Sequence, residues 1–179
     1  GTSYESTVYI NDIPSNEFEK WLKLESERFD NMILRLFHTE LETVYEEFNM
    51  YQDRDRSRAD KAMMEGLFPS HPYGRDVIGL PEHLKNPSMV NIYKFAETWY
   101  KPNNMAIAIA GDIDPEEAIV KIDKYFGDLE PNPDLPEIVK PLEEPIKEPI
   151  VKEVIGPDAE SVAFSYRFEG SKSKDEKYV

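Results

Sequence analysis

The chain has 179 residues, of which 40% are hydrophobic and 12% aromatic, so it can bury a core and is not a globally disordered protein. Its formal net charge of -15 argues against nucleic acid as a partner, because phosphate binding needs clustered lysine and arginine. It has no cysteine, which excludes disulfides and thiolate metal sites, and no apolar run approaches the roughly 20 residues of a membrane span.

The first half of the chain predicts mostly helix. Residues 6–10 (STVYI) favour a short strand, because β-branched and aromatic side chains follow one another. Ser15 or Asn16 is expected to cap the first helix, and residues 53–60 are expected to bend or fray the second. Apolar residues at helical spacing indicate helices over 15–29, 38–55 and 61–68.

The middle of the chain predicts a loop, a helix, and then a strand followed by a helix. Prolines and glycines punctuate residues 69–84, which indicates a loop before a helix over 87–100. Residues 103–112 (NNMAIAIAGD) resemble a buried strand. Asp114 at the N-cap and Pro115 at the first helical position predict that a helix follows.

Residues 130–149 differ in composition from the rest of the chain, because six of the fourteen prolines fall there. Such a stretch is expected to be extended, as a linker or as a strap along the surface. Two strand candidates follow, the second alternating Val162, Phe164, Tyr166 and Phe168. The predicted division is the main part of a domain over 1–129, the charged Pro-rich strap or linker over 130–149, and C-terminal strands of the same domain or the start of the next segment over 150–179.

Four glutamates lie on the expected helix His38–Asp55, and the helical period divides them into two pairs. At about 100° per residue, Glu42 and Glu46 face water. Glu40 and Glu47 lie within about 20° of each other at the edge of the apolar face. Two partly desolvated carboxylates repel each other unless a cation or donors compensate. They are therefore either an edge-of-core pair satisfied by Arg54, Arg56, Arg58, a lysine or the backbone, or a cation site.

The three histidines form no helical metal pair, since no two of them are three or four residues apart. His71, in SHPYG, is expected to shape a turn. His83 is expected at the surface near the start of a helix, and His38 as a capping or core-edge histidine. No Ser/His/Asp or Cys/His arrangement for nucleophilic catalysis is recognisable.

Four segments in the chain occur in an order that is typical of one peptidase family. They are TSYESTVY, ELETVYEEFNM, HPYGRDVIG and WYKPNNMAIAIAGDID. With these segments the chain resembles the inverted-zincin zinc peptidases of the pitrilysin and insulinase type, relatives of the mitochondrial processing peptidases. The resemblance implies an α+β fold, an antiparallel sheet covered by helices, incomplete at its N-terminus.

The resemblance also assigns roles to individual residues. It implies that Glu47 is a zinc ligand and that Glu40 supports the zinc site without binding the metal itself. It also implies that Thr2 and Ser3 lie on a strand edge where substrate peptides pair. The general base and two histidine ligands of the family belong to an H-x-x-E-H motif, which is absent from this chain and is expected upstream of Gly1.

The resemblance implies that the intact protein is a zinc metalloendopeptidase that hydrolyses peptides, with zinc as its cofactor. This chain alone is expected to be an inactive fragment without tightly bound zinc. The alternative is a non-catalytic structural or peptide-binding domain of the same fold. Expected partners are a peptide substrate and the remainder of the polypeptide or a second homologous half. We expect a soluble protein of the bacterial periplasm or cytoplasm, and an unpaired sheet edge that favours self-association.

Overall fold

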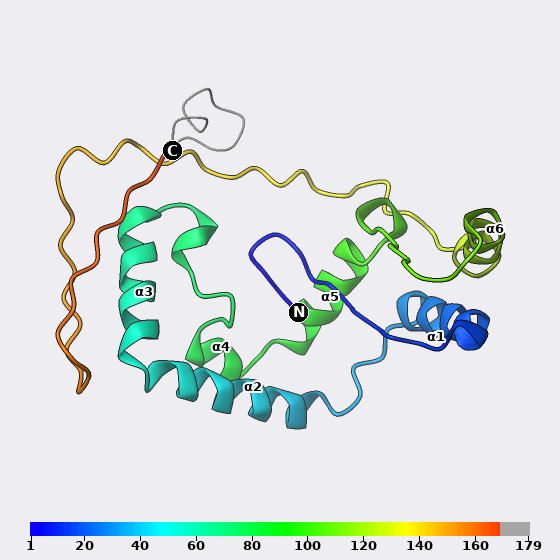
Figure 1. The fold of residues 1–179 in the computed structure, drawn as a ribbon, viewed down its shortest axis with the longest axis horizontal. Helices are drawn as coiled ribbons and strands as arrows, with labels where there is room; N and C mark the ends of the chain where they lie inside the picture. The colour runs from blue at the N-terminus through cyan, green and yellow to red at the C-terminus, as the bar shows by residue number, and fades with distance from the viewer. Residues whose placement is uncertain (169–179) are drawn as a thin grey trace. The chain divides into compact units, whose positions relative to one another are not determined.

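The computed structural model describes residues 1–168, and its regular elements are helices (Figure 1). In chain order they are η1 (Ser15–Glu17), α1 (Phe18–Asp30), α2 (Phe37–Gln52), α3 (Asp55–Leu67), η2 (Pro72–Gly74), α4 (Pro81–Lys85), α5 (Met89–Trp99), η3 (Pro102–Asn104) and α6 (Pro115–Phe126). Extended or irregular chain joins them, and no β-strand occurs in residues 1–168.

The predicted antiparallel sheet is therefore wrong for the described part of the chain. A strand forms only where its N–H and C=O groups meet those of a neighbouring strand, and strand propensity depends strongly on that context. Here side chains bond the extended backbone instead. Arg58 donates to the carbonyl of Ile155 at 3.1 Å, and the Asp158 N–H donates to the carboxylate of Asp55 at 2.8 Å.

The chain divides into two compact units, each built from separate stretches of sequence. Unit 1 contains Gly1, Thr7–Glu40 and Asn86–Ile138. Unit 2 contains Thr2–Ser6, Leu41–Lys85 and the chain from Val139 onward. The division into 1–129, 130–149 and 150–179 stays a prediction.

Unit 1 is organised around the packing of α1 against α6. Leu22 of α1 is completely buried, and Ala118 of α6 is buried as well. The Glu19 carboxylate accepts hydrogen bonds from Lys124 Nζ at 2.6 Å and from the Tyr125 hydroxyl at 2.8 Å, and these bonds join the two helices.

The start of α6 confirms the capping prediction. The Asp114 Oδ1 accepts hydrogen bonds from the N–H groups of Glu116 and Glu117, both at 3.0 Å, and Pro115 is the first helical residue. These bonds satisfy two of the backbone donors that a helix N-terminus leaves without intrahelical partners.

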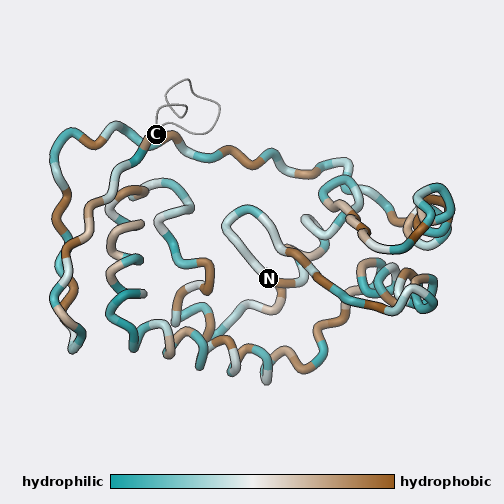
Figure 2. Tube along the Cα trace, viewed as in Figure 1, coloured by the Kyte–Doolittle hydropathy of each residue, from teal (hydrophilic) through white to brown (hydrophobic). Residues whose placement is uncertain are grey.

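Unit 2 is organised around α3, which packs against η2 and against extended chain. Phe48 of α2 is its buried hydrophobic residue. Figure 2 shows hydrophobic and hydrophilic residues alternating along the extended chain from 139 to 168. The alternation is strict, one residue in two, only over Val162, Phe164, Tyr166 and Phe168.

Candidate functional site

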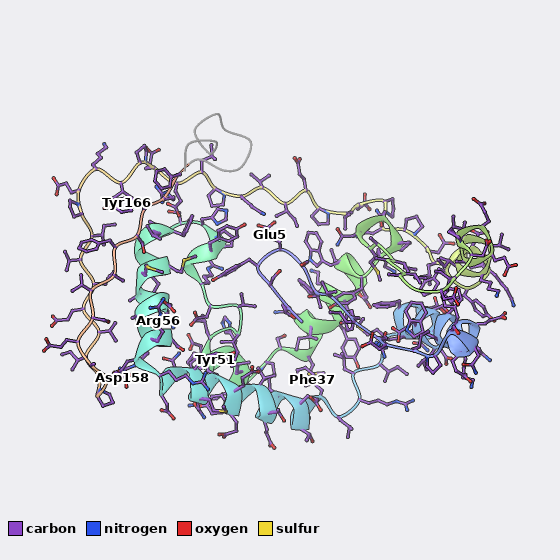
Figure 3. All side chains as sticks on the ribbon, viewed as in Figure 1. Glu5, Phe37, Tyr51, Arg56, Asp158 and Tyr166 are labelled. Atoms are coloured by element: carbon purple, nitrogen blue, oxygen red, sulfur yellow. The ribbon has the colours of Figure 1, made fainter. Side chains whose placement is uncertain are left out.

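Helix α2 carries the residues that the sequence singled out as candidate metal ligands. The helix begins at Phe37, directly after Leu36, whose φ of 56° is uncommon for a residue other than glycine. Glu40 lies in the first turn, where the partial positive charge of the helix N-terminus favours a carboxylate. Figure 3 shows Phe37 and Tyr51 toward the two ends of this helix.

Glu40 and Glu47 are both exposed on α2, and so are Glu42 and Glu46. Burial therefore does not separate the two pairs, although the seven-residue spacing still places Glu40 and Glu47 on one side of the helix. Within residues 1–168, none of these four carboxylates has a hydrogen-bond or ion-pair partner. They are free to accept a cation that comes from outside this part of the chain.

The arginines that were expected to compensate Glu40 and Glu47 contact other groups. Arg56 pairs with Asp60 at 3.0 Å, and Arg58 pairs with Asp55. The guanidinium of Arg54 lies over the ring of Tyr51, 5.9 Å from its centroid. The alternative in which one of these arginines satisfies the pair is therefore not what the structure shows.

The described residues do not form a zinc site by themselves. Among residues 1–168, no group of three or more His, Asp or Glu side chains is placed to hold a metal ion. A zinc site needs at least three protein ligands. The His38 ring contacts Phe37, with ring centroids 5.7 Å apart, and does not complete a ligand set with Glu47. Glu47 can therefore supply one ligand of a site whose other ligands come from elsewhere.

Thr2 and Ser3, the predicted substrate-strand residues, are exposed at the start of a tight turn. The Ser3 N–H donates to the carbonyl of Ser6 at 2.8 Å, and the two serine hydroxyls lie 3.1 Å apart. The Ser3 N–H is thus already bonded within the turn. A peptide that pairs here as an added strand would have to compete with that bond.

A second cluster of polar residues lies in unit 2, around the loop between α3 and η2. The Glu143 carboxylate, 8% exposed, accepts hydrogen bonds from the N–H groups of Ser70 at 2.6 Å and His71 at 2.5 Å. Arg167 lies 3.9 Å from the same carboxylate and donates to the carbonyls of Leu67 and Glu144. These bonds tie the loop to two extended stretches that are distant in sequence.

His71 shapes the turn at η2, as its sequence context predicts. Its Nδ1 accepts a hydrogen bond from the Tyr73 N–H at 3.1 Å, and the two rings pack edge to face with centroids 4.4 Å apart. Gly74 follows, and a Cβ there would collide with the carbonyl oxygen of Phe68. The HPYG segment is therefore a structural turn in this molecule, with its histidine engaged as a cap.

Glu5 lies at the edge of the same cluster, where the Tyr73 hydroxyl and the Lys140 ammonium both donate to it. The bond from Lys140, and then the bond from Tyr73, hold the pKa of the Glu5 carboxyl below its ordinary value. The same carboxylate raises the pKa of Lys140 and of Tyr73. The pairing favours the charged forms of Glu5 and Lys140, whereas for Tyr73 it favours the neutral hydroxyl, which donates the hydrogen bond, over the phenolate.

Sequence patterns do not identify Glu143, Arg167 and Lys140 as members of a cluster. Glu143 is 72 residues from His71 along the chain, and Lys140 is 135 residues from Glu5. Local patterns such as capping boxes and helical periods do not reach across such separations. The local pattern next to this cluster is the HPYG turn, which predicts a tight backbone turn that other groups must stabilise.

Comparison with known proteins places the chain in a family. Residues 90–179 match a family model described as the peptidase M16 inactive domain. The chain belongs to the peptidase M16 family. The resemblance to zinc peptidases that the four ordered segments carry is thereby confirmed.

Relatives in this family are named as zinc proteases. The chain is 28% identical over 128 residues to the uncharacterized zinc protease ML0855 of Mycobacterium leprae, covering 70% of this chain and 29% of that protein. It is 33% identical over 93 residues to the uncharacterized zinc protease YmfH of Bacillus subtilis, covering 52% of this chain and 22% of that protein. The chain thus spans less than a third of the length of these relatives.

A solved structure shares the fold of this M16 chain. The first half of the periplasmic protease PqqL from Escherichia coli superposes with a TM-score of 0.62 at 24% identity, covering 72% of this chain and 28% of that one.

No helix within residues 1–168 is both long and apolar enough to cross a membrane.

Proposed function

We propose that the intact protein is a zinc-dependent metalloendopeptidase that hydrolyses peptides, and that this chain contributes Glu47 as one zinc ligand. The support is membership of the M16 family together with relatives that are named as zinc proteases. The remaining ligands and the general base belong to an H-x-x-E-H motif outside this chain, on the remainder of the polypeptide or on a homologous second half.

The state of Glu47 in the structure supports this role. Its carboxylate is exposed and, within residues 1–168, has no partner that a metal ion would need to displace. Ligating carboxylates are usually oriented by a neighbouring group. Glu40 lies about two helical turns from Glu47 on the same side of α2. We propose that Glu40 orients Glu47 or a histidine ligand. Thr2 and Ser3 are the proposed place where substrate pairs.

The test compares adjacent glutamates of α2 in the intact protein. Glu47→Gln keeps the size of the side chain but removes the charge that zinc binds, so we expect zinc content and kcat/KM toward peptides to fall at least tenfold. Glu46→Gln is the matched control, because Glu46 is also exposed and without a partner, and it should keep both values. Glu40→Gln should have a milder effect than Glu47→Gln.

Wild-type zinc content in the Glu47→Gln protein would rule out the proposed ligand. Equal losses in the Glu46→Gln and Glu47→Gln proteins would also count against it, since that result would indicate a general effect of charge on α2.

A second candidate function is a non-catalytic domain that contributes structure or peptide contacts. It is favoured by the description of the family model that matches residues 90–179 as an inactive domain. In that case Glu40 and Glu47 have no metal to bind. The intact protein would then hold no zinc at Glu47, and Glu47→Gln would leave activity and zinc content unchanged while truncation of peptide-contacting residues weakened peptide binding.

A further inference from the structure

The turn Thr2–Ser6 leaves one main-chain acceptor facing outward. The Ser3 N–H donates to the carbonyl of Ser6 at 2.8 Å, and the Ser3 hydroxyl accepts a hydrogen bond from the Ser6 N–H at 3.2 Å. The peptide bond between Thr2 and Ser3 is trans, so its C=O points opposite to its N–H. The Thr2 carbonyl therefore points away from Ser6. A peptide N–H can donate to this carbonyl while the Ser3 bond stays in place.

Glu5 and Tyr4 join the turn Thr2–Ser6 to other segments of unit 2. The Tyr73 hydroxyl and the Lys140 ammonium both donate to Oε1 of Glu5, from positions 68 and 135 residues away along the chain. The ring of Tyr4 lies 5.0 Å from the ring of Tyr73, measured between the centroids. Figure 3 shows Glu5 on this turn. The orientation of the turn within unit 2 therefore depends on these contacts.

Tyr73 is itself held in place, so it can anchor the turn. Its N–H donates to His71 Nδ1 at 3.1 Å. Its ring packs edge to face on the rings of His71 and Phe68, with centroids 4.4 and 5.5 Å away. Phe68 is the residue that follows α3. The anchor thus belongs to the same unit as Glu47, the proposed zinc ligand.

We propose that Glu5 is a positioning residue for peptide binding: through Tyr73 and Lys140 it holds the turn so that the Thr2 carbonyl is ready to accept a peptide N–H. This inference rests on the proposed function, in which substrate pairs at Thr2 and Ser3. A turn without such contacts has to be ordered when the peptide binds, and the ordering costs affinity. Loss of the Glu5 contacts should therefore weaken peptide binding and leave the chemical step unchanged.

Peptide binding to the zinc-free intact protein tests the inference without cleavage. The probe is a set of fluorescein-labelled tryptic peptides of casein, and binding is followed by fluorescence anisotropy. Glu5→Ala removes both hydrogen bonds and should weaken binding about fivefold. Tyr73→Phe keeps the ring contacts and removes only the hydroxyl, so it should weaken binding about twofold. Glu148→Ala is the matched control, because Glu148 is an exposed residue of the same unit that takes no part in these contacts, and it should bind like the wild type.

Wild-type affinity in the Glu5→Ala or the Tyr73→Phe protein would overturn the inference. Equal weakening in the Glu148→Ala and Glu5→Ala proteins would overturn it too, since that result would reflect only the loss of one negative charge. A wild-type protein that binds none of the labelled peptides would also overturn it.

Steady-state cleavage of one of these peptides by the zinc-loaded protein separates this inference from the proposed function. Glu5→Ala should raise KM about fivefold and keep the wild-type kcat and zinc content, which is the pattern of lost binding rather than lost chemistry. A fall in kcat at unchanged KM would overturn the positioning role. Peptides that the wild type binds but does not cleave would contradict the peptidase proposal, whereas weaker binding in Glu5→Ala would still support the role of Glu5.

Discussion

The exposed glutamates of α2 and Glu143 of unit 2, whose side chain is largely covered, are chemically the same group in opposite surroundings. Glu40 and Glu47 are exposed and, within residues 1–168, have no hydrogen-bond or ion-pair partner. Glu143 is 8% exposed and has two backbone N–H donors and a nearby guanidinium. A buried carboxylate with several partners holds a fold together, whereas an exposed one without partners is available to a ligand.

The difference separates acidic residues with structural contacts from the proposed ligands in a chain that has 36 acidic residues. Substitutions at Glu143 should affect stability first, because its partners remain behind without a bond. Substitutions of the exposed glutamates on α2 should leave the stability of the isolated chain almost unchanged, and we expect their effect in the intact protein.

The largest effect on stability is expected for Glu143→Ala. The variant leaves the N–H groups of Ser70 and His71 and the charge of Arg167 without their carboxylate, which should lower the free energy of unfolding by about 3 kcal/mol. Urea denaturation measures this loss. Glu144→Ala is the control, because only the backbone carbonyl of Glu144 takes part in the cluster. Equal stabilities of the two variants would show that the hydrogen bonds of Glu143 do not stabilise the fold.

A smaller loss is expected where a carboxylate caps a helix. Asp114→Ala removes the acceptor of two N–H groups at the start of α6 and should lower the free energy of unfolding by about 1 kcal/mol. Thermal or urea denaturation measures the difference from the wild type. Asp112→Ala, two residues earlier and outside the cap, should stay within about 0.5 kcal/mol of the wild type.

The pH dependence of stability should show a still smaller effect of Glu5. Hydrogen bonds from Lys140 and Tyr73 lower the pKa of Glu5 in the folded chain. A lowered pKa stabilises the fold above the unfolded value of about 4.3, and this contribution is lost as the pH falls through the folded value. Glu5→Gln should therefore flatten the decline in urea midpoint between neutral pH and pH 3. An unchanged decline in the Glu5→Gln chain would contradict the assignment to Glu5.

The smallest effect is expected for the two candidate site residues in the isolated chain. The double variant Glu40→Gln with Glu47→Gln removes no contact within residues 1–168, so its free energy of unfolding should stay within about 0.5 kcal/mol of the wild type. Urea denaturation of the 179-residue chain checks this. A large destabilisation would mean that these carboxylates are structural and would remove the contrast with Glu143.

Sequence predicts the helices of this chain well and its extended segments poorly. The start of α6 follows from Asp114 and Pro115, and the turn at His71 follows from the residues beside it, because caps and turns depend on a few neighbouring residues. Residues 162–168 have the alternation of a strand, yet their contacts are with the side chains and carbonyls of other segments. Whether an extended segment joins a sheet depends on distant partners, which a local pattern does not specify.

The candidate site shows the same limit. The helical period places Glu40 and Glu47 on one side of α2, and that arrangement is local. Whether these side chains are buried depends on parts of the chain that are distant in sequence. In the structure all four glutamates of α2 are exposed. Glu143, whose side chain is largely covered, lies in the Pro-rich stretch where no periodic pattern marks an inward face.

Elemental analysis of the purified 179-residue chain, after dialysis against zinc and then against zinc-free buffer, shows whether the chain holds zinc by itself. We propose that it supplies one ligand, Glu47, to a zinc site that other residues complete. Because a single carboxylate holds zinc weakly, we expect far less than one zinc per chain, in the wild type and in Glu47→Gln alike. One zinc per wild-type chain, lost in Glu47→Gln, would show that this chain assembles a complete site and would rule out the proposed shared site.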